Sequence, residues 1–202
     1  MPLLQVFLKK QNPMKNIIPF ILVIIIAGGA GFGFQRYLQN KNNDLPAVMP
    51  KTAGSDIVGT KRPAFKLKDL QDKLRNINEW NGKVLLVNFW ATWCPPCKRE
   101  MPAFIELYEQ YNEQGFEIIG IALDDKESVQ NFVDTLGVDY TIMAAEYKGL
   151  ELSRIYGNHI GALPFSVFID RDGIIKVSHA GELSKKQVED IIRPLLAKGV
   201  SN

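Results

Sequence analysis

The chain has 202 residues, of which 46% are hydrophobic and 23% charged, and its formal net charge is +2. Residues 1–60 carry six Lys/Arg and two acidic residues, whereas residues 61–202 carry 18 Lys/Arg and 20 Asp/Glu, a net charge of −2. The C-terminal part is therefore long enough for one domain with its own core. Its near-neutral charge argues against nucleic acid as a partner.

The N-terminal part contains an uncharged apolar run of 18 residues, 17–34. This length just suffices to cross a bilayer as a helix, so we expect a transmembrane signal anchor. A cleaved signal peptide is the alternative, but its apolar region is usually shorter. Lys9, Lys10 and Lys15 precede the run, so the positive-inside bias places residues 1–16 in the cytoplasm. Met14 is a second candidate start of the chain.

Residues 35–60 are polar, contain two prolines and show no periodic pattern, which is typical of a flexible tether. Residues 61–202 are expected to form the folded domain outside the cytoplasm. Gly29 and Gly33 match the spacing of a helix-dimer motif, but the signal is weak in so glycine-rich a segment, and we expect a monomer.

The remaining chain alternates between strand and helix patterns. Strands are predicted over residues 64–67, 84–90, 116–122, 140–143, 165–169 and 174–178, and helices over 96–111, 127–136, 150–156 and 184–197. Residues 69–81 are rich in turn formers, and the turn 170–173 predicts a hairpin between the last two strands. The pattern indicates an α/β fold with a mixed central sheet flanked by helices.

The two cysteines of the chain, Cys94 and Cys97, lie where the apolar strand 84–90 leads into the start of the helix 96–111. At the start of a helix the first backbone N–H groups are free and the dipole favours a thiolate. We therefore expect a redox dithiol in which Cys94 attacks a disulfide and the more shielded Cys97 resolves the mixed disulfide.

A metal site is the main alternative for these cysteines. A structural zinc site takes four Cys or His ligands, and the chain adds only His159 and His179, which are far apart in sequence. We therefore assign no metal ligand. A copper chaperone that uses the two thiolates remains a rival hypothesis.

The active-site segment resembles that of a known family. Residues 89–97, Phe-Trp-Ala-Thr-Trp-Cys-Pro-Pro-Cys, are closely similar to the thioredoxin active site. Pro102 matches the proline that kinks the thioredoxin helix, and Leu163-Pro164 resembles the cis-proline loop of that fold. Asn88 stands where thioredoxins carry a buried aspartate.

Three further features resemble the membrane-anchored TlpA/ResA-like thiol-disulfide oxidoreductases. They are the entry Arg62-Pro63-Ala64-Phe65, the extra segment 128–156 and Glu100, three residues after Cys97. The resemblance implies a thioredoxin-like fold and a role for Glu100 in passing a proton to or from Cys97. A solvated charge on the first helical turn is the alternative for Glu100.

The resemblance also implies how substrates bind and where electrons come from. Substrates would contact Trp93, Pro95, Pro96, Leu163 and Pro164, and pair as an added strand beside Pro164. They would be disulfides of exported proteins, such as apocytochromes c, with a membrane thiol carrier of the DsbD/CcdA type as electron donor. The enzyme would need no organic cofactor and would sit in the bacterial inner membrane, with its catalytic domain in the periplasm or outside the cell.

The redox poise is expected to be reducing. Pro95 and Pro96 place no positive charge between the cysteines, and such a charge would stabilise the thiolate and make the pair more oxidising. We expect a potential of about −250 mV. A disulfide-forming oxidase is the alternative, and it would differ only in its reduction potential. A peroxiredoxin-like enzyme would need a separate peroxidatic cysteine, and the chain has only Cys94 and Cys97.

Overall fold

The computed structural model describes residues 56–199. The predicted cytoplasmic segment, the transmembrane anchor and most of the tether lie outside these residues. Among the helices within 56–199, none combines the length and the apolar character needed to cross a bilayer. Residues 59 and 60, assigned above to the tether, bond to the domain: Gly59 N donates to Ile175 O (2.8 Å), and Ile175 N donates to Thr60 O (2.9 Å).

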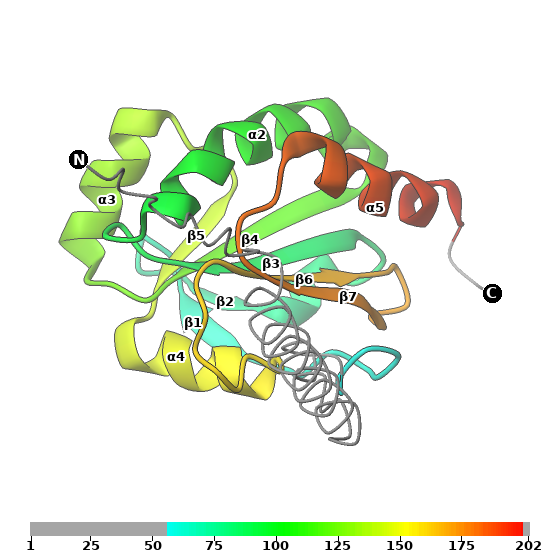
Figure 1. The fold of residues 1–202 in the computed structure, drawn as a ribbon, viewed down its shortest axis with the longest axis horizontal. Helices are drawn as coiled ribbons and strands as arrows, with labels where there is room; N and C mark the ends of the chain where they lie inside the picture. Colours follow the sequence, from blue (N-terminus) through cyan, green and yellow to red (C-terminus); the bar gives the residue numbers. More distant parts are fainter. Residues whose placement is uncertain (1–55, 200–202) are drawn as a thin grey trace, which may run out of the picture. The chain divides into compact units, whose positions relative to one another are not determined.

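A five-stranded mixed sheet with strand order β5-β4-β3-β6-β7 lies at the centre of the domain (Figure 1). Its strands are β3 (Val84–Trp90), β4 (Phe116–Ala122), β5 (Thr141–Ala144), β6 (Phe165–Ile169) and β7 (Ile175–Ala180). β3, β4 and β5 run parallel, whereas β6 is antiparallel to both β3 and β7. The prediction of a mixed sheet that ends in an antiparallel hairpin is confirmed.

Every residue of the central strand β3 is buried, because the sheet has an apolar core on each face. Side chains alternate along a strand, so β3 supplies both cores. One core receives Val84, Leu86 and Trp90, and the other receives Leu85, Val87 and Phe89. The polar Asn88 shares a face with Leu86 and Trp90.

Helices cover both faces of the sheet. The core that contains Trp90 is closed by α2 (Pro95–Tyr111), α3 (Lys126–Leu136) and α5 (Lys185–Ala197). The opposite core is closed by α4 (Glu146–Ile155), which lies on the other side of the sheet from α2 and α5 in Figure 1. Short 3-10 turns, η2 (Ile77–Trp80) and η3 (Asn112–Gln114), precede β3 and β4.

Helix α4 begins four residues before the predicted start at residue 150. Its buried residues are Gly149, Leu152 and Ser153, so the inward stripe is mostly small or polar and gives little hydrophobic periodicity. Gly149 has a packing reason, since a Cβ there would lie 3.3 Å from the side chain of Leu123.

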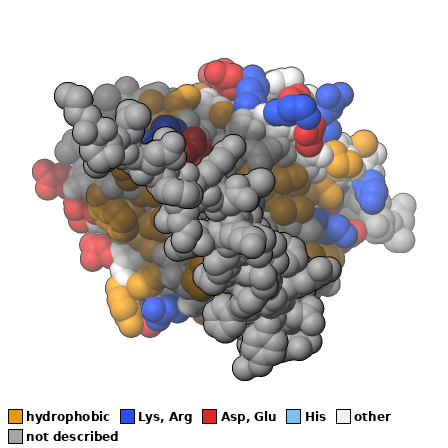
Figure 2. All heavy atoms as spheres, viewed as in Figure 1, with side chains coloured by type: hydrophobic (Ala, Val, Ile, Leu, Met, Phe, Trp, Pro, Cys, Tyr) orange, Lys and Arg blue, Asp and Glu red, His pale blue; other side chains and the backbone are white. Residues whose placement is uncertain are grey.

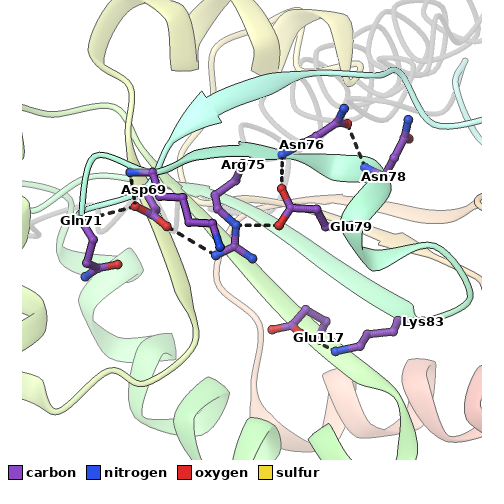
Figure 3. Close-up of polar contacts among 9 residues, drawn as sticks. Asp69, Gln71, Arg75, Asn76, Asn78, Glu79, Lys83 and Glu117 are labelled. Carbon is purple, nitrogen blue, oxygen red and sulfur yellow. Dashed lines mark hydrogen bonds and ion pairs between the residues drawn. The ribbon is translucent and has the colours of Figure 1, made fainter.

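The turn-rich segment 69–81 contains a strand that the sequence analysis did not predict. β1 (Lys66–Lys68) pairs antiparallel with β2 (Leu74–Asn76) as a separate two-stranded sheet. The side chain of Arg75 lies between two carboxylates, 3.4 Å from Asp69 Oδ2 and 2.8 Å from Glu79 Oε2 (Figure 3). Its guanidinium also lies 4.8 Å from the centroid of the Trp80 ring. These polar and cation–π contacts hold a hairpin that has little apolar patterning.

The surface carries charges of both signs. On the face drawn in Figure 2, the described Lys/Arg and Asp/Glu side chains lie interspersed. This arrangement agrees with the net charge of −2 of residues 61–202.

Candidate active site

The dithiol lies where β3 leaves the sheet and α2 begins. Cys94 is the N-cap residue of α2, and its Sγ accepts a hydrogen bond from Cys97 N over 3.4 Å. The two cysteines form a disulfide with a Cα–Cα distance of 5.3 Å. Pro95 and Pro96 occupy the first helical positions, where the missing N–H groups interrupt no helical hydrogen bond.

The two sulfur-bearing residues differ little in exposure. Cys97 is fully buried and Cys94 retains 4% exposure, so Cys94 is less open than its place at a helix start suggests. The first turn of α2 holds no acidic residue, so no carboxylate competes with the sulfur of Cys94 for the positive end of the helix dipole. A reduced Cys94 is therefore in a position that favours its thiolate.

The two tryptophans before the dithiol have opposite environments. Trp93 is 64% exposed, whereas Trp90 is fully buried and packs against Phe132, with ring centroids 5.5 Å apart. Trp93 therefore offers an aromatic surface beside the disulfide, and Trp90 belongs to the core. Next to Cys94, Pro95 is exposed and Pro96 is half-buried.

The predicted cis-proline is present, since the Leu163–Pro164 peptide bond is cis. The β3–β6 register places Phe165 opposite Phe89, so Pro164 lies at the same end of the sheet as the loop that leads to Cys94. Pro164 O accepts a hydrogen bond from Gly181 N over 2.8 Å. Pro164 is buried and Leu163 is half-buried.

Glu100 is buried in the core below the disulfide, with 1% exposure, so it is not the solvated charge considered as an alternative. Its Oε1 accepts a hydrogen bond from Asn88 Nδ2 (2.9 Å), and its Oε2 accepts one from Leu183 N (3.0 Å). Burial raises the pKa of Glu100 to about 8, although both hydrogen bonds act to lower it. On a helix, residues three apart are neighbours, so Glu100 and Cys97 lie on the same side of α2, one turn apart.

Two further residues contribute to the site: Asn88, noted above at the position of the thioredoxin aspartate, and Asn158, which the sequence analysis did not name. Asn88 contacts Glu100 directly, and its signal was a polar residue inside an otherwise apolar strand. Asn158 is fully buried and closes the loop before the cis-proline: its Nδ2 donates to Ala162 O and its Oδ1 accepts from Ala162 N, both over 2.9 Å. No sequence pattern marked Asn158.

The two histidines belong to different segments of the structure. His159 Nε2 lies 2.9 Å from Asp56 Oδ2, while His179 is part of β7. Across the described part of the chain, no three His, Cys, Asp or Glu side chains group in a way that could hold a metal ion.

Comparisons with known proteins agree with this geometry. A family model described as Redoxin matches residues 57–192. The thiol-disulfide oxidoreductase ResA of Bacillus thuringiensis is 33% identical over 177 residues, covering 87% of this chain and 93% of the relative. ResA of Halalkalibacterium halodurans is 40% identical over 129 residues, which are 63% of this chain and 71% of the relative.

A solved structure shows the same fold. The thiol:disulfide interchange protein of the thioredoxin family from Chlorobium tepidum aligns with a TM-score of 0.64 at 30% identity, covering 69% of this chain and 97% of that one. The predicted thioredoxin-like fold is thereby confirmed for the domain. The Cys-x-x-Cys pair at the start of α2 agrees with these relatives. The chain therefore belongs to the Redoxin family, as a ResA-type thiol-disulfide oxidoreductase.

Proposed function

We propose that the chain is an extracytoplasmic reductase that donates two electrons from Cys94 and Cys97 to disulfides of exported proteins, apocytochromes c among them. The observation that supports a reductase rather than an oxidase is the composition of the first turn of α2. Pro95 and Pro96 remove two backbone donors next to Cys94, and they add no cation. Compared with a pair that carries a cation between its cysteines, this thiolate is less stabilised, so the reduced form is less favoured and the pair is a stronger electron donor.

The reaction proceeds by two exchanges. The Cys94 thiolate attacks one sulfur of the substrate disulfide, forms a mixed disulfide and releases the first substrate thiolate. Cys97 then loses its proton and attacks Cys94 Sγ, which forms the Cys94–Cys97 disulfide and releases the second substrate thiolate. Both released thiolates take up protons, so the substrate gains two electrons and two protons.

Glu100 serves as the proton acceptor for Cys97 in the second exchange. Its pKa of about 8 is close to that of a free thiol, about 8.5, and proton transfer is most effective between groups of matched affinity. In the reverse direction, when the disulfide is reduced again, the protonated Glu100 returns a proton to Cys97. Both partners of this proton transfer, Glu100 and Cys97, lie on α2.

The substrate lies across the exposed Trp93 and Pro95 and beside Leu163 and Pro164. An extended segment at Pro164 adds its backbone to the edge of the site, as in other cases of strand addition. The relatives named thiol-disulfide oxidoreductase ResA support a disulfide as the substrate. We propose no organic cofactor, no metal and no nucleic acid partner, and we expect a monomer.

Residues 17–34 are proposed to anchor the chain in the bacterial inner membrane, with the catalytic domain in the periplasm or outside the cell. A dithiol there cannot draw on cytosolic thioredoxin, so its electrons would come from a membrane dithiol carrier of the DsbD/CcdA type.

The reduction potential of the detergent-solubilised full chain tests the proposal. The chain is equilibrated with dithiothreitol or glutathione buffers, and its thiols are alkylated and counted by mass spectrometry. A potential at or below about −220 mV supports a reductase. A potential near about −120 mV would instead make the chain a disulfide donor.

A further inference from the structure

The side-chain amide of Asn88 joins two buried acceptors. Its Nδ2 donates to Glu100 Oε1 over 2.9 Å and to Ser166 Oγ over 3.0 Å. Asn88, Glu100 and Ser166 are exposed by 2%, 1% and 0%. An amide nitrogen carries two hydrogens, so these two bonds use its full donor capacity inside the core.

The sheet fixes the position of this amide. Asn88 on β3 lies directly opposite Ser166 on β6, and Ser166 follows Pro164 by two residues. The amide is therefore held between the strand that begins at the cis-proline and the helix that carries the dithiol. Since Ser166 Oγ accepts one amide hydrogen, the other is directed at Glu100.

Several groups facing Glu100 act on its charge in opposite directions. Donors at Asn88 Nδ2 and Leu183 N favour the carboxylate, whereas burial favours the neutral acid. The exposed Glu182, in the loop before α5, also opposes ionisation and pairs with Arg99 over 2.5 Å.

The other polar neighbours of Glu100 supply no positive charge that would stabilise its carboxylate. Cys97 lies one turn away on the same helix and is the proton partner itself. Burial raises the pKa of the Tyr140 hydroxyl, and the nearby charge of Glu100 raises it further. Asn88 Nδ2 is thus one of two hydrogen-bond donors that stabilise the carboxylate form of Glu100.

We propose that Asn88, oriented by Ser166, is a positioning residue that keeps the buried Glu100 able to lose its proton within the working pH range. Without this donor, the carboxylate, which is already the minor form of Glu100 near neutral pH, would become rarer still, so Glu100 would accept the proton of Cys97 less readily. The inference rests on the proton-acceptor role given to Glu100 under the proposed function, but the ionisation of Glu100 can be measured separately.

The test is a carboxyl carbon-13 NMR titration of the reduced full chain, labelled at glutamate and held in detergent micelles. Glu100→Gln identifies the Glu100 signal. We expect Asn88→Leu to raise the titration midpoint of Glu100 by about one pH unit, the size expected for a lost hydrogen bond to a charge. Ser166→Ala should raise it by less, because the amide remains but loses its anchor.

Glu182→Gln provides a test on the surface that leaves the buried network intact. Removing its charge should lower the midpoint, opposite to Asn88→Leu. Ser166→Ala keeps the inference testable if the Asn88 variant does not fold. Asp134→Asn, on the exposed face of α3, is the matched control and should leave the midpoint unchanged.

The pH dependence of mixed-disulfide resolution is measured on the same variants. A resolution profile that moves with the NMR midpoint supports the inference. A midpoint in Asn88→Leu or Ser166→Ala equal to that of the parent chain would overturn it. A third outcome separates the two proposals. If the Glu100 midpoint rises in Asn88→Leu but Glu100→Gln resolves the mixed disulfide as fast as the parent chain, the role of Asn88 is supported and the proposed proton transfer by Glu100 is wrong.

Discussion

Asp124 holds Thr92 by two hydrogen bonds to a single carboxylate oxygen. Thr92 N lies 3.2 Å from Asp124 Oδ2, and the Thr92 hydroxyl donates to the same atom. Asp124 follows the end of β4, and its Oδ1 accepts from Asp125 N, the N-cap residue of α3. The carboxylate thus fastens the loop that carries Trp93 and Cys94 to the neighbouring parallel strand.

Asp124→Ala should lower the free energy of unfolding by about 1–3 kcal/mol, because it leaves two donors of a part-buried loop without an acceptor. Urea denaturation of the oxidised chain measures this change. Asp134→Ala, which removes an exposed carboxylate on α3, should change stability by less than about 0.5 kcal/mol. Equal stability of the two variants would show that the Thr92 contacts contribute nothing.

The buried Glu100 should make stability depend on pH. Its pKa rises from an ordinary 4.5 to about 8 on folding, so between these values the folded chain keeps a proton that the unfolded chain has lost. The contribution is fully present below about pH 4.5 and is lost as pH rises to about 8, by on the order of 3–5 kcal/mol. Denaturation of the parent chain and of Glu100→Gln over this range measures it. A parent curve as flat as the glutamine variant's would contradict the buried, protonated acid.

Replacing Cys94 and replacing Cys97 should have different effects on the mixed disulfide with substrate. Cys97→Ser should accumulate a mixed disulfide with a substrate peptide, because the attacking thiol remains and the resolving thiol is gone. Cys94→Ser should accumulate none, since its remaining thiol is fully buried. Mass spectrometry of the acid-quenched chain counts the adducts. Adducts on Cys94→Ser and none on Cys97→Ser would reverse the assignment.

Trp93→Ala should lower kcat/KM for a protein disulfide about tenfold, equal to about 1.4 kcal/mol, and leave reduction of a small aromatic disulfide nearly unchanged. The reason is that an indole 64% exposed beside the disulfide can contact a polypeptide but adds little for a small reagent. Tyr147→Ala is a control with an aromatic side chain of similar exposure, 67%, on α4. An equal loss for both substrates would assign Trp93 to the dithiol itself.

The positions of the main strands and helices could be predicted because their patterns are local. Six of the seven residues of β3 are apolar, and α2 and α5 show helical spacing of apolar residues. By contrast, β2 and the first turn of α4 were missed. β2 depends on Arg75 contacting Asp69 and Glu79, and α4 turns the small Gly149 inward. Neither arrangement produces an apolar period.

The candidate site divides in the same way. The sequence by itself determined the dithiol, the likeness to thioredoxin, the proline before β6 and the placement of Glu100 one turn after Cys97, because these depend on order along the chain. Only the tertiary structure decided that Glu100 is buried and which groups hold it. Leu183 lies 83 residues away, and Ser166, which fixes Asn88, lies 78 residues from it. Burial and hydrogen-bond partners arise when distant segments pack together, and no local pattern records which segments will meet.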